Sequence, residues 1–207
     1  MIGNTDAIKV KSEPVFLNNL RQTTGPAHKA LEELPLSRSI VQSDITIDMY
    51  AKYLRHMHQV VKDVEENISP LLSSIVPDIT NRKKSTLIEK DLKSLKFDNP
   101  SEKDNPLTQS LHSISIPFAL GIFYVIEGST LGGRFILKNV QTSLGLDQNE
   151  GASYFAGYGE QTGQLWKSFL NAMTGYEEQN DCADEIIKGA DFAFRSIHKY
   201  FEASTQV

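Results

Sequence analysis

The sequence predicts an all-α fold built as one domain. Apolar residues recur at helical spacing along most of the 207 residues, and no stretch shows the sustained period-two alternation of a half-buried strand. The chain is long enough to bury a core without covalent staples. Its single cysteine, Cys182, excludes an internal disulfide framework. We therefore expect one helical domain over residues 1–207, in which 1–13 form a flexible N-terminal arm.

The clearest helix covers residues 46–69, where the apolar side chains fall within one stripe about 140° wide. Periodicity also fits helices at the remaining ranges, which are 14–34, 82–96, 116–145, 160–176 and 181–203. The segment "DNPSEKDNP" at 98–106 predicts a surface loop, because its Asn-Pro pairs and charges disfavour helix. This loop connects two groups of helices, whose apolar stripes would pack together into the core.

Composition argues against several classes of partner. The formal net charge is −5, with acidic and basic residues interspersed, which disfavours a nucleic-acid surface. The first residues lack the apolar core of a secretory signal, and no run approaches the roughly eighteen apolar residues of a membrane span. We expect a protein of the cytoplasm with neither nucleic acid nor a membrane as its partner.

The histidines in "HMH", His56 and His58, raise the question of a metal site. On a regular helix their side chains lie about 160° apart, at opposite edges of the apolar stripe, so they cannot share one ion. No Glu-x-x-His pair occurs anywhere, so the ligands of a di-iron bundle site are missing. We expect both histidines to be solvated.

The first predicted helix carries a candidate ligand. In "FLNNLRQTTGPAHKALEEL", His28 lies at one edge of the apolar stripe and about 20° from Arg21, which is two turns and about 10 Å earlier. This separation suits one cofactor whose iron binds the imidazole and whose peripheral carboxylate pairs with the guanidinium. Taken alone, a histidine beside a core stripe is far more often solvated or locally satisfied than a ligand, and such an arginine is more often simply on the surface. Pro26 either kinks this helix or lies in the first turn of a helix begun near Thr24.

Several glycines lie inside the predicted helix 116–145, although each weakens a helix by about 0.5–1 kcal/mol relative to alanine. Gly121, Gly128 and Gly132 fall within about 40° of one another, so the backbone is bare on that face. Close packing on another helix would require a second small-residue seam, and no comparable seam is visible. A planar ligand lying on the bare backbone, with the helix bent across it, would require an axial donor elsewhere, and His28 is available.

Three motifs follow one another in a recognisable order: "LRQTTGPAHKALE" at 20–32, "YVIEGSTLGG" at 124–133 and "YFAGYGEQTGQLWKSFLNAM" at 154–173. They resemble the proximal helix, the glycine-rich distal helix and the Tyr-Gly…Trp segment of the haem oxygenase family, especially its soluble bacterial members. The resemblance spans nearly the whole chain. It implies a haem oxygenase-like helical bundle with a kinked glycine-rich distal helix.

The resemblance also implies roles for the matching residues. His28 matches the proximal iron ligand, which makes it the metal-binding residue. The distal-helix glycines, whose backbone contacts the haem and the bound oxygen species, are matched by Gly128, Gly132 and Gly133.

One position departs from the animal-type members of the family, which carry an aspartate after the first distal glycine. Here that position is Ser129, whose hydroxyl can relay a proton through water but holds no charge. Several bacterial members share this Gly-Ser pattern. Glu127 and Thr130 are further candidates for the proton network. The alternative is ordinary: Glu127 is then a solvated helix residue, and the two hydroxyls bond back to the helix.

The implied reaction is oxidative cleavage of the haem macrocycle to biliverdin with release of CO and ferrous iron, so that haem is both cofactor and substrate. Arg21 matches the basic residue that pairs with one haem propionate, and Lys167 matches a second such partner in a looser alignment. O2 is the oxidant, and electrons would come from a ferredoxin or a flavin-dependent reductase. A bacterial phytochrome is a candidate bilin acceptor. Two alternatives stay open, namely a non-catalytic haem-binding or haem-sensing protein and a helical interaction module without haem.

Overall fold

The computed structural model describes residues 14–100 and 103–203, and the arm predicted at 1–13 lies outside them. Its helices, in chain order, are α1 (Val15–Glu33), α2 (Pro35–Ser39), α3 (Ile47–Asp63), α4 (Ser85–Ser94), α5 (Ile116–Leu144), α6 (Ser153–Ala156), α7 (Thr162–Asn180) and α8 (Ala183–Ala203). A π-helical turn (Val64–Ile68) and three 3-10 turns (Ser69–Leu72, Ile79–Arg82 and Gly159–Gln161) complete the list. The described part of the chain holds no strand, so the all-α prediction is confirmed.

The observed helix ends have local causes. The Ser115 hydroxyl accepts the Phe118 amide and caps the start of α5, while Gly145, at φ 71°, ends the helix in the left-handed conformation. The segment predicted as one helix at 46–69 changes to a π turn after Asp63. The helix predicted from residue 82 begins at Ser85 instead, because 79–82 form a separate 3-10 turn.

Pro26 does not interrupt the first helix. α1 runs without a break from Val15 to Glu33, with Pro26 in its interior. Pro26 is exposed, so its ring does not pack in the core. His28 and Arg21 therefore belong to one continuous helix, as their common face requires.

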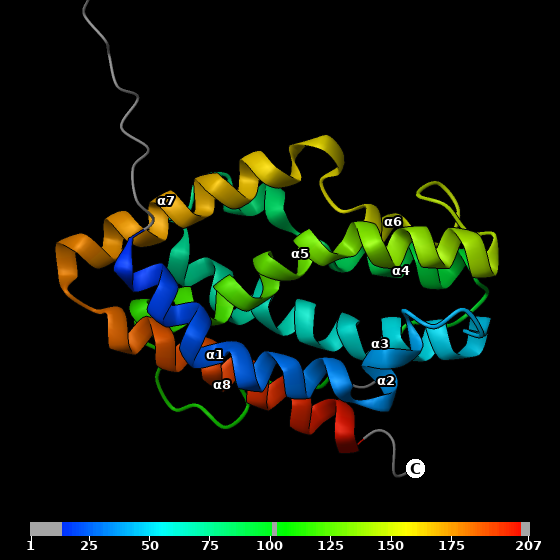
Figure 1. Cartoon of the computed structure of the whole chain (residues 1–207), viewed down its shortest axis with the longest axis horizontal. Coiled ribbons are helices and arrows are strands. Elements are labelled where there is room, and N and C mark those ends of the chain that lie inside the picture. Colours follow the sequence, from blue (N-terminus) through cyan, green and yellow to red (C-terminus); the bar gives the residue numbers. More distant parts are fainter. Residues whose placement is uncertain (1–13, 101–102, 204–207) are drawn as a thin grey trace, which may run out of the picture.

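The core of the molecule forms where α5 crosses its neighbours. α5 packs most extensively against α8, and α8 in turn lies along α1, as Figure 1 shows. The closest approach is at Gly121, where an added Cβ would meet the Ile186 carbonyl oxygen and lie 2.6 Å from the Ala190 amide nitrogen. Gly189 stands against the Phe118 backbone in the same way. The expectation that no small-residue seam faces the glycines is therefore wrong, since Gly189 and Ala190 of α8 supply one for Gly121.

α5 is also the described helix that is long and apolar enough to cross a membrane by length and composition. Half of that apolar window is buried inside the protein, against α8 and the other helices that surround it. Its hydropathy is that of a core helix, because its apolar side chains form the centre of the bundle.

Candidate functional site

A cavity of about 830 Å³ opens between α1, α3, α5 and α8, and residues of α6 and α7 also line it. Most of its lining is apolar, and the volume lies within the range typical of small-molecule sites. The residues predicted for the site that line it are Arg21, His28, Gly128, Ser129, Thr130, Gly132 and Gly133. Tertiary packing thus brings two sequence motifs about a hundred residues apart onto the two sides of one cavity.

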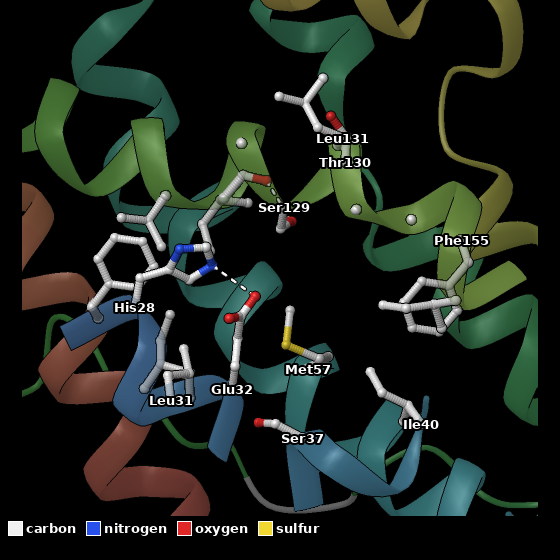
Figure 2. A pocket seen from close by; sticks show the side chains of 18 of the residues that line it. His28, Leu31, Glu32, Ser37, Ile40, Met57, Ser129, Thr130, Leu131 and Phe155 are labelled. Atoms are coloured by element: carbon white, nitrogen blue, oxygen red, sulfur yellow. Dashed lines mark hydrogen bonds and ion pairs between the residues drawn. The ribbon is translucent and has the colours of Figure 1, made fainter. Parts of the chain in front are cut away.

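His28 projects from α1 towards the segment of α5 that carries Ser129, as Figure 2 shows. Its side chain is 55% exposed, so the imidazole is accessible from the cavity. The ring packs 5.0 Å from the Phe194 ring, and Nε2 lies 3.2 Å from an oxygen of Glu32, one turn later on α1. Arg21 lines the same cavity from the same helix.

The glycines of α5 serve two different purposes. Gly132 faces open space, because an added Cβ would have no other atom within 4 Å. At Gly133 a Cβ would stand 2.8 Å from the Phe155 carbonyl oxygen, so this glycine allows α6 to approach α5. Gly128 lies under Trp166, whose nearest ring atom would be 3.5 Å from a Cβ, an ordinary contact. The single bare face expected from the helical wheel is thus divided into a packing seam at Gly121 and an open backbone at Gly132.

The hydroxyls of Ser129 and Thr130 point back along the helix. Ser129 Oγ donates to the Ile126 carbonyl oxygen at 2.7 Å, and Thr130 Oγ1 donates to the Glu127 carbonyl oxygen at 2.6 Å. Both hydroxyls therefore bond back to the helix, which was the alternative to a role in the proton network. The Tyr154 phenol borders the same cavity, and while burial raises its pKa, the neighbouring Ser129 hydroxyl acts to lower its pKa.

Tyr154 and Phe155 are placed by a buried carboxylate. Asp91 of α4 accepts the amides of Ser153 and Tyr154 at 2.8 Å each and the Ser153 hydroxyl at 2.5 Å. It therefore caps α6 from a neighbouring helix and fixes the segment that closes the cavity. Burial raises the pKa of Asp91, while these hydrogen bonds act in the opposite direction. Burial also raises the pKa of the Tyr154 phenol, which keeps it protonated.

Several residues of the wall were not expected from the sequence. Tyr53 and Met57, one turn apart on α3, line the cavity, and Phe194 contributes from α8. Both α3 residues belong to the apolar stripe of that helix, and the sequence pattern does not distinguish a cavity-lining residue in such a stripe from a core residue. Lys84 also lines the cavity, and its only sequence signal was its place in the basic run "NRKK".

Glu127 and Lys167 are not among the described residues that line the cavity. Glu127 is only 1% exposed and accepts hydrogen bonds from buried cations behind the wall, so its interpretation as a solvated residue is wrong. Lys167 is exposed on α7, because Trp166, its neighbour in sequence, takes the inward direction. No residue of the described chain groups with others into a cluster of three metal-binding side chains.

The two histidines of α3 are not solvated as expected. His58 is only 3% exposed and its Nε2 lies 2.9 Å from Glu89 of α4, whose pKa is lowered chiefly by that hydrogen bond. His56 is half-buried, with its ring 5.5 Å from the Tyr200 ring. Both are structural, because each packs on a neighbouring element that periodicity alone does not reveal.

Known proteins resemble this chain in sequence and in fold. The sequence model of the family described as "Heme oxygenase" matches residues 15–203. Heme oxygenase PigA of Pseudomonas aeruginosa is 30% identical over 184 residues, which are 88% of this chain and 89% of that protein. The heme oxygenase of Neisseria meningitidis shares the fold, with a TM-score of 0.77, 23% identity, and 93% and 92% of the two chains covered. The Synechocystis heme oxygenase-1, solved in complex with heme, has a TM-score of 0.72, 16% identity, and 91% of each chain covered.

A family match over residues 15–203 agrees with the cavity described above, since both contain the segment around His28 and the glycine-rich part of α5. The relatives cover most of this chain and most of their own length, so the likeness is not confined to one motif. This chain belongs to the haem oxygenase family of oxidoreductases.

Proposed function

We propose that this protein is a haem oxygenase that cleaves the haem macrocycle oxidatively to biliverdin and releases CO and ferrous iron. The observation that carries the proposal is the position of His28, an accessible imidazole across an apolar cavity from the open backbone at Gly132. A planar ligand can lie between the two. In this proposal haem is both cofactor and substrate.

The residues of the cavity fit haem. The space of about 830 Å³ is mostly apolar, as a macrocycle requires, and a basic side chain, Arg21, stands at its border for a carboxylate. The imidazole of His28 is the type of ligand that haem iron takes in proteins. Gly132 leaves room that any side chain would reduce. These features together support haem more strongly than the family name alone.

When bound, haem supplies the iron that activates O2 and the ring carbon that is oxidised. His28 would hold the iron, while the Glu32 carboxylate, already 3.2 Å from the ring nitrogen, would orient the imidazole. Arg21 would pair with a propionate. Lys167 could serve a second propionate only from the outside of α7, where the structure places it.

Protons would reach the cavity through hydroxyl groups. The Ser129 hydroxyl, the Thr130 hydroxyl and the protonated Tyr154 phenol all line the cavity. A hydroxyl relay moves a proton without a carboxylate at the position of Ser129. The open backbone at Gly132 would leave space in the cavity for O2 and water. Glu127 would act on this network only through the cations that surround it.

The remaining components of the reaction come from outside the chain. Electrons would come from a ferredoxin or a flavin-dependent reductase, and the bilin would pass to an acceptor such as a bacterial phytochrome. The proposed setting is the cytoplasm, with neither nucleic acid nor a membrane as a partner.

The test begins with hemin added to the purified protein, followed by a reductant and O2. We expect a Soret band that His28→Ala removes or shifts, and its decay into biliverdin absorption upon reduction. A wild-type protein that gives no Soret band on hemin addition refutes haem binding altogether. A stable Soret band without bilin supports instead a haem-binding or haem-sensing protein. The Ser129 hydroxyl favours this alternative, because it donates its proton to the helix backbone.

A further inference from the structure

A cluster of buried charges stands directly behind the α5 wall of the cavity. The Glu127 carboxylate accepts from Arg82 Nη1 at 2.8 Å through one oxygen and from Lys84 Nζ at 2.8 Å through the other. The Tyr158 hydroxyl donates to the second oxygen, also at 2.8 Å. All three charged side chains are at most 3% exposed. The proposed reaction gives neither Arg82 nor Lys84 a direct contact with the ligand.

The members of this cluster are held in one orientation. Arg82 donates to the Pro77 carbonyl oxygen at 3.1 Å and to the Leu165 carbonyl oxygen of α7 at 3.2 Å. The Lys84 ammonium lies 4.7 Å from the centre of the Tyr158 ring and donates to the Arg82 carbonyl oxygen at 3.2 Å. Because Arg82 donates to two backbone carbonyl oxygens and to the Glu127 carboxylate, the cluster has little freedom to rearrange.

The charges of the cluster lie differently with respect to the cavity. Lys84 lines the cavity, whereas Arg82 and Glu127 are not among the described lining residues. A second carboxylate, Glu65, lies nearby and accepts the Lys84 and Ser85 amides at the start of α4, so it is bound to backbone. Of the charged side chains in this cluster, Lys84 is therefore the one that borders the cavity.

Stability alone is a poor explanation for such a cluster. Moving charges out of water is costly, and well-packed apolar replacements of buried ion pairs are often neutral or stabilising. A buried ammonium at the wall of an apolar cavity has a stronger effect on a ligand than one in water, because the effective dielectric constant is lower there. The arrangement is thus better explained by an action on what the cavity binds.

We propose that Lys84, held by Glu127, Arg82 and Tyr158, is an electrostatic positioning residue that favours negative charge on a ligand at the α5 wall of the cavity. This inference rests on the proposed haem function. It adds a residue that would set the affinity for small anions in the cavity that His28 also lines. Glu127 moderates this effect, because its carboxylate lies behind the ammonium and has the opposite sign.

The test compares charge variants of the hemin-loaded protein. Azide, an anion, and imidazole, neutral at pH 8, are titrated into the ferric complex and followed by the Soret shift. We expect Lys84→Met to weaken azide binding about fivefold, because the variant loses a positive charge whose attraction for an anion is strengthened by the low effective dielectric constant of the buried site. Glu127→Gln, which keeps the shape and removes the negative charge, is expected to strengthen azide binding. Imidazole affinity is expected to change little in either variant.

Matched variants separate charge from damage to the fold. Lys84→Arg keeps the charge and is expected to retain most of the azide affinity, while Lys83→Met removes an exposed neighbouring charge and is expected to change it little. If Glu127→Gln does not fold, comparing the azide affinities of Lys84→Met and Lys84→Arg still shows whether the charge at position 84 matters. Equal azide affinity in those two variants, or loss of azide and imidazole binding in parallel, overturns the inference. A wild-type protein that gives no Soret band refutes the haem function itself, so the two failures are distinguishable.

Discussion

Two glycines of α5 are expected to respond in opposite ways to the same substitution. At Gly121 a methyl group would meet backbone atoms of α8, including the Ala190 amide nitrogen at 2.6 Å. Backbone cannot rotate away, so the cost lies near the upper end of the range for overpacking, about 3 kcal/mol. The gain in helix propensity returns about 1 kcal/mol. We therefore expect Gly121→Ala to lower the free energy of unfolding by about 2 kcal/mol.

At Gly132 the same methyl group would meet no atom within 4 Å. Only the propensity gain remains, so Gly132→Ala is expected to raise the free energy of unfolding by about 0.5–1 kcal/mol. For a chain of this length, 1 kcal/mol corresponds to about 2–4 °C in Tm. The expected shifts are thus a fall of about 4–8 °C for Gly121→Ala and a rise of about 1–4 °C for Gly132→Ala.

Thermal denaturation of the protein without haem, followed by circular dichroism, measures both shifts. A hemin titration of the Gly132→Leu variant completes the comparison, because the larger side chain would fill space that the ligand needs. We expect this variant to keep its fold and to lose most of its hemin affinity. Destabilisation by Gly132→Ala, or loss of stability and of binding together in Gly132→Leu, would show that Gly132 is a packing residue and that the reasoning is wrong.

Three further predictions concern the residues around the cavity. Asp91→Ala removes the buried cap that fixes α6, and we expect a loss of about 1–3 kcal/mol in urea denaturation; an unchanged midpoint would contradict this role. The hydrogen bond to His58 lowers the pKa of Glu89 in the folded protein. The ionised Glu89 carboxylate therefore stabilises the fold above its unfolded pKa of 4.5, and this stabilisation is lost as the pH falls through the lower pKa of the folded state. Glu89→Gln should therefore flatten the decline of Tm in this acidic range, and a decline as steep as in the wild type would exclude the effect. Tyr154→Phe is expected to slow bilin formation severalfold while leaving hemin affinity unchanged, and a normal rate would remove Tyr154 from the proton relay.

Much of the fold could be predicted because helical periodicity is a local property. The apolar stripe at 46–69 and the glycine-rich segment were visible in the sequence; the glycine-rich helix has nearly the expected bounds, and the stripe forms α3 followed by the π turn Val64–Ile68. The same local reading failed for His58 and Glu127, which were expected to be solvated and are buried. Each has its partner on another element, Glu89 in one case and Arg82 with Lys84 in the other. Sequence spacing does not reveal partners of this kind.

The residue types at the site follow from the sequence: an imidazole on the first helix, bare backbone on α5, and a hydroxyl at position 129. How they are used depends on the packing of the helices. Gly121 packs on α8 and Gly132 faces the cavity, although they share a face of one helix. The physical reason is that the crossing helix covers only part of that face, and the position of the crossing depends on every contact between α5 and α8.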